Sequence, residues 1–115
     1  MKKYLKFKVS DAQQVLIDTS TISRVIGPGT GGADNTNQVA ILTTHVGLGV
    51  TNASEVLAYK LTFGTMDAAA NAVAVNTIID SIGVALTTSW TNPIYDMTGK
   101  TVNACSQIEY DQLVF

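Results

Sequence analysis

The sequence has few of the side chains that most often carry chemistry. Among its 115 residues there is one cysteine, one histidine and one tryptophan. Cys105 therefore has no partner for an internal disulfide or a paired-cysteine metal motif, and no basic residue nearby in sequence favours its thiolate. His45 has no partner at a spacing that suggests a catalytic triad or a metal site. We interpret Cys105 as a small half-buried residue and His45 as a strand-end residue without a chemical role.

Charge is also scarce. Charged residues make up 14% of the chain, against about 25% in an average soluble domain, and the net charge is -2. Affinity for a nucleic-acid backbone comes largely from Lys and Arg side chains that neutralise phosphates. Four of the seven basic residues form the only basic cluster, on one short segment: Lys2, Lys3, Lys6 and Lys8. We expect no nucleic-acid partner and interpret the cluster as a solvated strand face that discourages aggregation. Contact with an acidic partner surface or with nucleic acid is the alternative.

Long apolar runs are missing as well. No uninterrupted apolar stretch approaches the roughly 20 residues that span a bilayer. The N-terminal segment has the positive charge of a signal peptide, but its lysines alternate with apolar residues instead of preceding an apolar run. We therefore expect a soluble chain with no membrane partner.

Small neutral side chains take the place of charge. Hydrophobic residues make up 46% of the chain, and Thr occurs 15 times beside many Asn, Ser, Ala and Gly. This content excludes disorder by composition, and residues 1–115 are long enough to close one core as a single domain. Uncharged groups cost far less to desolvate than ions, so such a surface suits a subunit with large contacts.

The periodicity of the apolar residues predicts an α+β fold. Alternation with period two predicts strands at residues 4–9, 14–18, 38–44, 55–63 and 107–115, with residues 19–26 continuing extended. Steps of three and four predict one helix over residues 67–89, with Thr65 or Asp67 as its cap and Gly83 as a weak point. Its expected buried stripe is Ala72, Val75, Ile79, Ile82 and Leu86. We expect a mostly antiparallel sheet with this amphipathic helix packed on one face.

One glycine motif deserves comparison with the phosphate-binding loops. Gly27, Gly29 and Gly32 match G-x-G-x-x-G and follow a predicted strand. A phosphate-binding loop needs a helix to open directly after the glycines, whereas residues 34–37 intervene here and a strand follows. Residues 34–37 are similar to a calcium loop but lack its alternating ligands and closing Glu. We interpret residues 27–35 as a connecting loop, with at most an adventitious cation site.

The remaining candidates are scattered. Asn52 begins a formal glycosylation motif that we attribute to chance, because no secretory signal precedes it. Trp90 fits a core position after the helix better than a ligand platform. The aspartates stand mostly beside turns or caps: Asp11, Asp18, Asp34, Asp67, Asp80, Asp96 and Asp111. We expect no catalytic, cofactor-binding or metal-binding residues, and no enzymatic activity.

The order of segments resembles a known class of viral proteins. Residues 4–9, 14–18 and 22–26, followed by a helix that leads into Ser-Trp-Thr-Asn-Pro at residues 89–93, resemble the small virion structural proteins of marine tailed phages, such as cyanophages. The resemblance implies a particle component, such as a capsid decoration protein, made in the host cytoplasm and located in the virion. It supplies no catalytic residues.

Two hypotheses follow from the sequence. In the first, the chain is a virion-associated decoration or cement subunit, a homo-oligomer whose partners are copies of itself and the capsid shell proteins. In the second, it is a small monomeric binding module, or a minor enzyme, that uses the Gly27–Asn37 loop. A nucleic-acid role through the four N-terminal lysines ranks third. The oligomer number and the place in the particle stay open.

Overall fold

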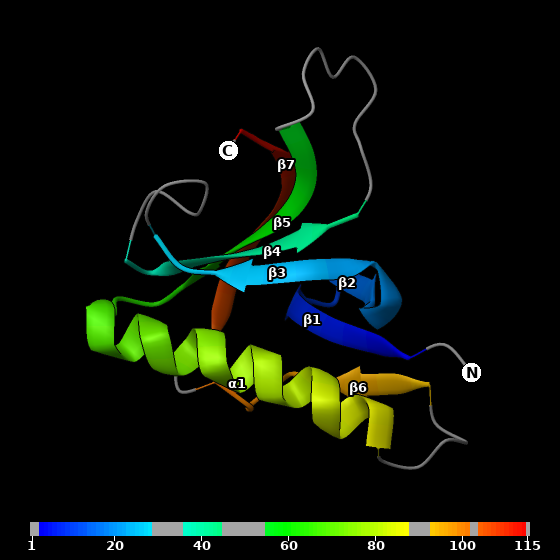
Figure 1. The fold of residues 1–115 in the computed structure, drawn as a ribbon. Coiled ribbons are helices and arrows are strands. Elements are labelled where there is room, and N and C mark those ends of the chain that lie inside the picture. The colour runs from blue at the N-terminus through cyan, green and yellow to red at the C-terminus, as the bar shows by residue number, and fades with distance from the viewer. Residues whose placement is uncertain (1–2, 29–35, 45–54, 88–92, 102–103, 115) are drawn as a thin grey trace.

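The computed structural model describes residues 3–28, 36–44, 55–87, 93–101 and 104–114 (Figure 1). Its elements in chain order are β1 (Tyr4–Ser10), β2 (Gln13–Asp18), the 3-10 helix η1 (Thr19–Thr21), β3 (Ile22–Ile26), β4 (Gln38–Thr43), β5 (Glu55–Phe63), α1 (Ala68–Thr87), β6 (Ile94–Asp96) and β7 (Cys105–Val114). The predicted α+β class, with one helix packed on mostly antiparallel strands, is confirmed.

The strands form two sheets, where the sequence predicted one. The smaller sheet has the order β2-β1-β6, and the larger has the order β3-β4-β5-β7. The division falls at η1, in a stretch predicted to be continuously extended. There the Asp18 carboxylate accepts a hydrogen bond from the Ser20 N–H (2.9 Å) and caps a tight turn. This turn directs the chain out of the hairpin with β1, so β3 joins the second sheet.

The small sheet combines a predicted hairpin with an unpredicted parallel strand. β1 and β2 pair antiparallel, with Leu5 opposite Ile17, and the Lys8 ammonium forms an ion pair with the Asp11 carboxylate across the turn (2.7 Å). β6 pairs parallel with β1, and the Met97 N–H donates to the Lys6 carbonyl (2.9 Å). A strand of three residues is too short to give a periodic signal, which is why the periodicity predicted no strand there.

The larger sheet is built around β4, which is buried on both faces. Val39 and Ile41 belong to the main core, whereas Ala40 and Leu42 pack with Ala58 on the opposite face. This pattern is typical of a central strand and explains why β4 is almost continuously apolar.

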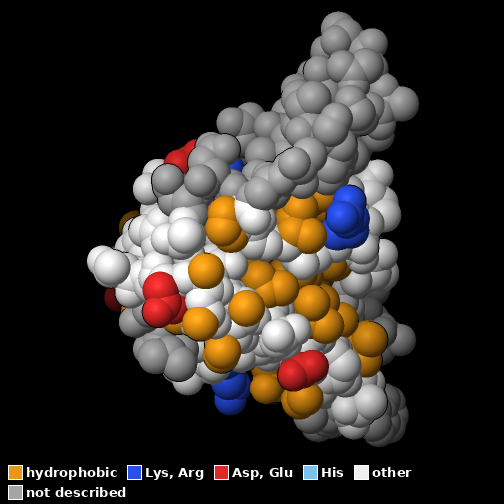
Figure 2. Space-filling model, turned by 60° about the vertical axis from the view of Figure 1, so that its left-hand side comes forward, with side chains coloured by type: hydrophobic (Ala, Val, Ile, Leu, Met, Phe, Trp, Pro, Cys, Tyr) orange, Lys and Arg blue, Asp and Glu red, His pale blue; other side chains and the backbone are white. Residues whose placement is uncertain are grey.

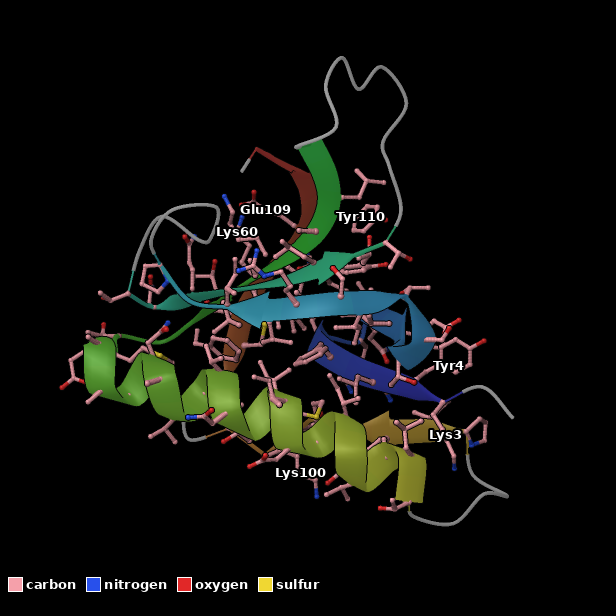
Figure 3. All side chains as sticks on the ribbon, viewed as in Figure 1. Lys3, Tyr4, Lys60, Lys100, Glu109 and Tyr110 are labelled. Carbon is pink, nitrogen blue, oxygen red and sulfur yellow. The ribbon has the colours of Figure 1, made fainter. Side chains whose placement is uncertain are left out.

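β5 and β7 form the long antiparallel pair of this sheet. In their register, Tyr59 lies opposite Tyr110 and Lys60 lies opposite Glu109 (Figure 3). The two tyrosine rings have centroids 4.3 Å apart and are tilted by 44°. Aromatic and opposite-charge pairs at directly opposed positions stabilise a two-stranded ladder, so these pairs help to hold β7 at its place in the sheet.

α1 lies across both sheets and closes the main core (Figure 1). It contacts β3 and β4 of the larger sheet and β1 of the smaller one. β3 contributes the half-buried Ile22 and Val25 to this core. The fully buried residues come from α1 and from strands of both sheets, and they include Leu5, Phe7, Ile17, Val39, Ile41, Leu61, Phe63, Ala74, Ile78 and Ala85. No ladder connects the two sheets among the described strands, so the packing of α1 on both helps to join them.

Candidate interaction surface

The helix begins where the sequence predicts it. Asp67 caps the first turn, because its carboxylate accepts a hydrogen bond from the Ala70 N–H (2.8 Å). Asp80 is the one charged residue within its 20 residues. A helix that is apolar nearly all round is typical of the interior of a protein, yet one side of α1 faces outward.

The predicted buried stripe is wrong. The residues that face the core are Asn71, Ala74, Ile78, Ser81 and Ala85, one position before each residue of the predicted stripe. Of that stripe, Ala72, Ile79 and Leu86 are exposed, and Val75 and Ile82 are half-buried at the edge of the core. One position along a helix is a rotation of about 100°, so the predicted stripe is one flank of the helix.

Two polar residues on the buried side explain the error. The Asn71 amide donates to the backbone carbonyls of Thr36 and Gln38 (both 2.8 Å), and the Ser81 hydroxyl donates to the Thr77 carbonyl (2.7 Å). A buried polar group costs little when its hydrogen bonds are satisfied. The sequence pattern treated these two positions as exposed, and so assigned the larger apolar residues to the core.

The outward side of α1 is rich in exposed apolar side chains. Figure 2 shows hydrophobic side chains clustered on this part of the molecule, with few charged ones among them. The exposed fractions are large, and the residues concerned are Val73 (54%), Ile79 (46%), Val84 (41%) and Leu86 (57%). Ile79 and Leu86 lie on one flank of the helix, and Val73 and Val84 lie on the other, about 140° away. Scattered exposed apolar residues are ordinary, but a group of them on one flank of an element marks a contact surface.

A groove lies beside the N-terminal half of this helix. It has a volume of about 410 Å³. It is lined by residues after β3 and along α1: Gly27, Pro28, Ala68, Asn71, Ala72, Val75 and Asn76. The groove is open to solvent along its length because the helix carries small side chains here. A second hollow, beside Phe7, Phe63 and Met97, has a volume of about 50 Å³, which is far below the roughly 300 Å³ of a typical ligand site.

The structure describes only some of the sequence candidates. Gly27 lines the groove, but Gly29 and Gly32 lie outside the described residues, as do His45, Asn52 and Trp90. Cys105 is half-buried as expected, and burial raises the pKa of its thiol, which disfavours the nucleophilic thiolate. Within the described ranges, no three His, Cys, Asp or Glu side chains gather as a metal site would require.

The lysine cluster is divided by neighbouring carboxylates. Lys3 is buried, which corrects its expected place on a solvated face, and Lys2 lies outside the described residues. The hydrogen bond and the attraction between Lys8 and Asp11 raise the pKa of the lysine and lower the pKa of the carboxyl. Lys6 lies opposite Asp96, whose pKa is lowered mainly by hydrogen bonds from Thr98. The charges of this cluster are thus partly compensated.

The length and composition of α1 also meet the requirements of a membrane-spanning helix. The sequence expectation concerned uninterrupted apolar runs, and Asn71, Asn76 and Ser81 interrupt this one without lowering its mean hydropathy below that of a membrane-spanning helix. Core helices of soluble proteins meet the same criterion, and α1 packs five residues into the core of this molecule.

Comparison with known proteins gives no relatives for this chain. No protein-family model, curated protein or solved structure matches it. The geometry of the candidate surface is that of an exposed apolar flank of α1, with Ile79 and Leu86, that continues into the groove beside Ala68 and Ala72.

Proposed function

We propose that this protein is a structural subunit that acts through protein–protein contacts, as a virion-associated decoration or cement protein. The observation that carries the proposal is the flank of α1 where Ile79 and Leu86 are exposed, a flank without charged residues that lies beside the groove. When a partner covers this surface, each Å² of apolar area removed from water contributes a stabilising free energy of about 25 cal/mol. Little of this free energy is offset, because almost no charged group has to be desolvated.

The composition supports the same function. A chain with 14% charged residues has a surface dominated by neutral side chains, which can enter a contact without strong charge pairing. The capsid as the setting is supported by the sequence resemblance of residues 4–26 and 89–93 to phage virion proteins. The resemblance supports the capsid as the place of the contacts, whereas the helix surface supports the way in which the contacts are made.

Sedimentation velocity of the purified chain tests the first part of the proposal. We expect the mean mass to rise above the 12.2 kDa of one chain as the concentration increases from micromolar to millimolar. Gel analysis of purified particles, from a host that produces this chain together with a capsid shell, tests the second part. A strict monomer that is also absent from particles contradicts the proposal.

The open groove favours one other function, a small-molecule binding module. Its volume of about 410 Å³ lies within the range of ligand sites, and it includes Gly27 and Pro28 from the predicted binding loop. A thermal-shift screen distinguishes the two functions. A ligand that raises Tm in the wild type but not in Ala72→Trp, where the indole fills the groove, identifies a binding module. We expect no such ligand.

A further inference from the structure

The exposed flank of α1 forms a seam with a regular spacing and a gradient of size. It consists of Ala68, Ala72, Val75, Ile79, Ile82 and Leu86, separated by steps of four, three, four, three and four. From the N-terminal end to the C-terminal end, the side chains grow from methyl groups to Ile and Leu. Ile79 and Leu86 are the most exposed large residues of this seam, and Val75 and Ile82 lie half-buried beneath them.

The spacing lets a second helix lie along the seam. The five steps cover 18 residues and average 3.6, the repeat of an α-helix, so the seam stays on one side of α1 over about five turns. The positions along the outer edge of the seam are Ala69, Asn76 and Gly83, all small and uncharged. A Cβ added at Gly83 would have no heavy atom within 4 Å, so nothing inside this chain requires a glycine there. The space beside Gly83 instead allows a second molecule to approach the helix closely.

We infer that the seam is covered by the same seam of a second copy, related by a two-fold axis so that the two helices run antiparallel. The inference rests on the proposed function and specifies its contact. Antiparallel pairing about residue 77 brings three kinds of layers together: Ala68 with Leu86, Ala72 with Ile82, and Val75 with Ile79. Every layer then joins a small side chain to a larger one, which fills the interface evenly.

The groove supports this arrangement independently of the spacing. It lies beside Ala68 and Ala72, at the small end of the seam, and it is bounded on its other side by Gly27 and Pro28. The antiparallel arrangement places Leu86 of the second copy at this level, where the groove receives its exposed side chain. The two-fold axis produces the same contact twice. Parallel pairing instead sets Leu86 against Leu86 and leaves both grooves empty.

The charges also favour a second copy over a lipid surface. α1 contains no Lys or Arg to contact anionic headgroups, and the carboxylate of Asp80 belongs to its outward side. Two identical seams bring no like charges into opposition, because every position of the seam and of its outer edge is neutral. Antiparallel helices also place opposite ends of their dipoles together.

Disulfide trapping between two variants tests the arrangement. Ala68→Cys and Leu86→Cys are each made in a Cys105→Ser chain and oxidised separately and as an equimolar mixture. We expect a heterodimer disulfide in the mixture and little self-linkage of either variant. In the antiparallel pair the two new cysteines are level with each other, whereas two copies of Cys at one position lie about 27 Å apart along the axis.

Two further pairs make the result decisive. Ala72→Cys mixed with Ile82→Cys is expected to behave in the same way, and it replaces the first pair if either of those variants fails to fold by circular dichroism. Val73→Cys mixed with Val84→Cys, on the opposite flank, is expected to give no heterodimer. Both of these control positions are as exposed as the seam, so exposure alone does not distinguish them.

The outcomes separate this inference from the function on which it rests. Self-linkage of Leu86→Cys, or equal linkage on both flanks, overturns the antiparallel seam. Association of the wild type without linkage at any seam pair also overturns it, but leaves the proposed assembly function intact. Flotation of the wild type with phosphatidylcholine–phosphatidylglycerol vesicles, together with no linkage, assigns the seam to lipid instead. A wild type that is monomeric at every concentration overturns both.

Discussion

Gly27 lies directly against the side chain of Asn71, so that a Cβ at position 27 would overlap Asn71 Oδ1. The same Asn71 amide donates hydrogen bonds of 2.8 Å to the carbonyls of Thr36 and Gln38. One buried residue of α1 therefore connects the end of β3 with the start of β4. It also supports the floor of the groove beside the seam.

Gly27→Ala should destabilise the fold. The added methyl group has to displace an amide that is held by two hydrogen bonds, and overpacking of this kind costs about 1–3 kcal/mol. The free energy of unfolding, measured by urea titration with circular dichroism, gives the value. Gly83→Ala is the control, because its Cβ has open space. There we expect an increase in stability of about 0.5–1 kcal/mol. Equal effects of the two substitutions would contradict the close contact at Gly27.

Asn71→Ala should cost about 2 kcal/mol or more. It removes both donors of a buried side chain and leaves the carbonyls of Thr36 and Gln38 without these part-buried hydrogen bonds. Asn76→Ala on the same helix is the matched control, since Asn76 is exposed and its replacement changes stability by no more than about 0.5 kcal/mol. If the two asparagines contribute equally, the bridging role of Asn71 is wrong.

Stability should fall at high pH through Tyr59. Burial, and then the neighbouring Tyr110, raise the pKa of Tyr59 above its usual value of 10.0. A group with a raised pKa in the folded state contributes stability that is complete below the unfolded pKa and is lost as the pH rises through the folded pKa. We therefore expect Tm to decrease above about pH 10.

Tyr59→Phe is the variant that isolates this effect. It keeps the ring beside Tyr110 but has no hydroxyl to ionise, so the decrease in Tm above pH 10 should become smaller. Thermal unfolding followed between pH 8 and pH 11 gives the comparison. The same slope in the variant and the wild type would exclude Tyr59 as its source.

The sequence predicted those elements whose local pattern agrees with their surroundings. β5 was predicted to the residue, because alternating apolar residues at 57–63 stop at Gly64. The helix position and its Asp67 cap followed from the change of period. The two-sheet arrangement could not be predicted, because it depends on a three-residue turn at Thr19–Thr21 and on β6, a strand too short for a pattern.

The candidate surface was present in the sequence but assigned to the wrong environment. The stripe from Ala72 to Leu86 was recognised as apolar and regular, and regularity alone does not say whether the core or a second copy covers it. The adjacent positions face the core instead, because the small Ala74 and Ala85 allow the helix to pack closely and the Asn71 amide donates a hydrogen bond to the Gln38 carbonyl at the start of β4. The regular stripe was thereby left facing outward.

The most direct test of the central claim, that the exposed seam of α1 is the contact surface, is sedimentation equilibrium of two matched double variants. Ile79→Gln/Leu86→Gln alters the seam, and Val73→Gln/Val84→Gln alters side chains of similar exposure on the opposite flank. Glutamine keeps high helix propensity, so both variants should fold.

We expect the seam variant to lose association by about 100-fold or more, because each dimer loses four apolar side chains that contribute up to about 1.5–3 kcal/mol apiece when fully buried. The opposite-flank variant should associate within about threefold of the wild type, because such exposed substitutions change interaction free energies little. Equal association of the two variants, or stronger loss on the Val73 flank, would contradict the account.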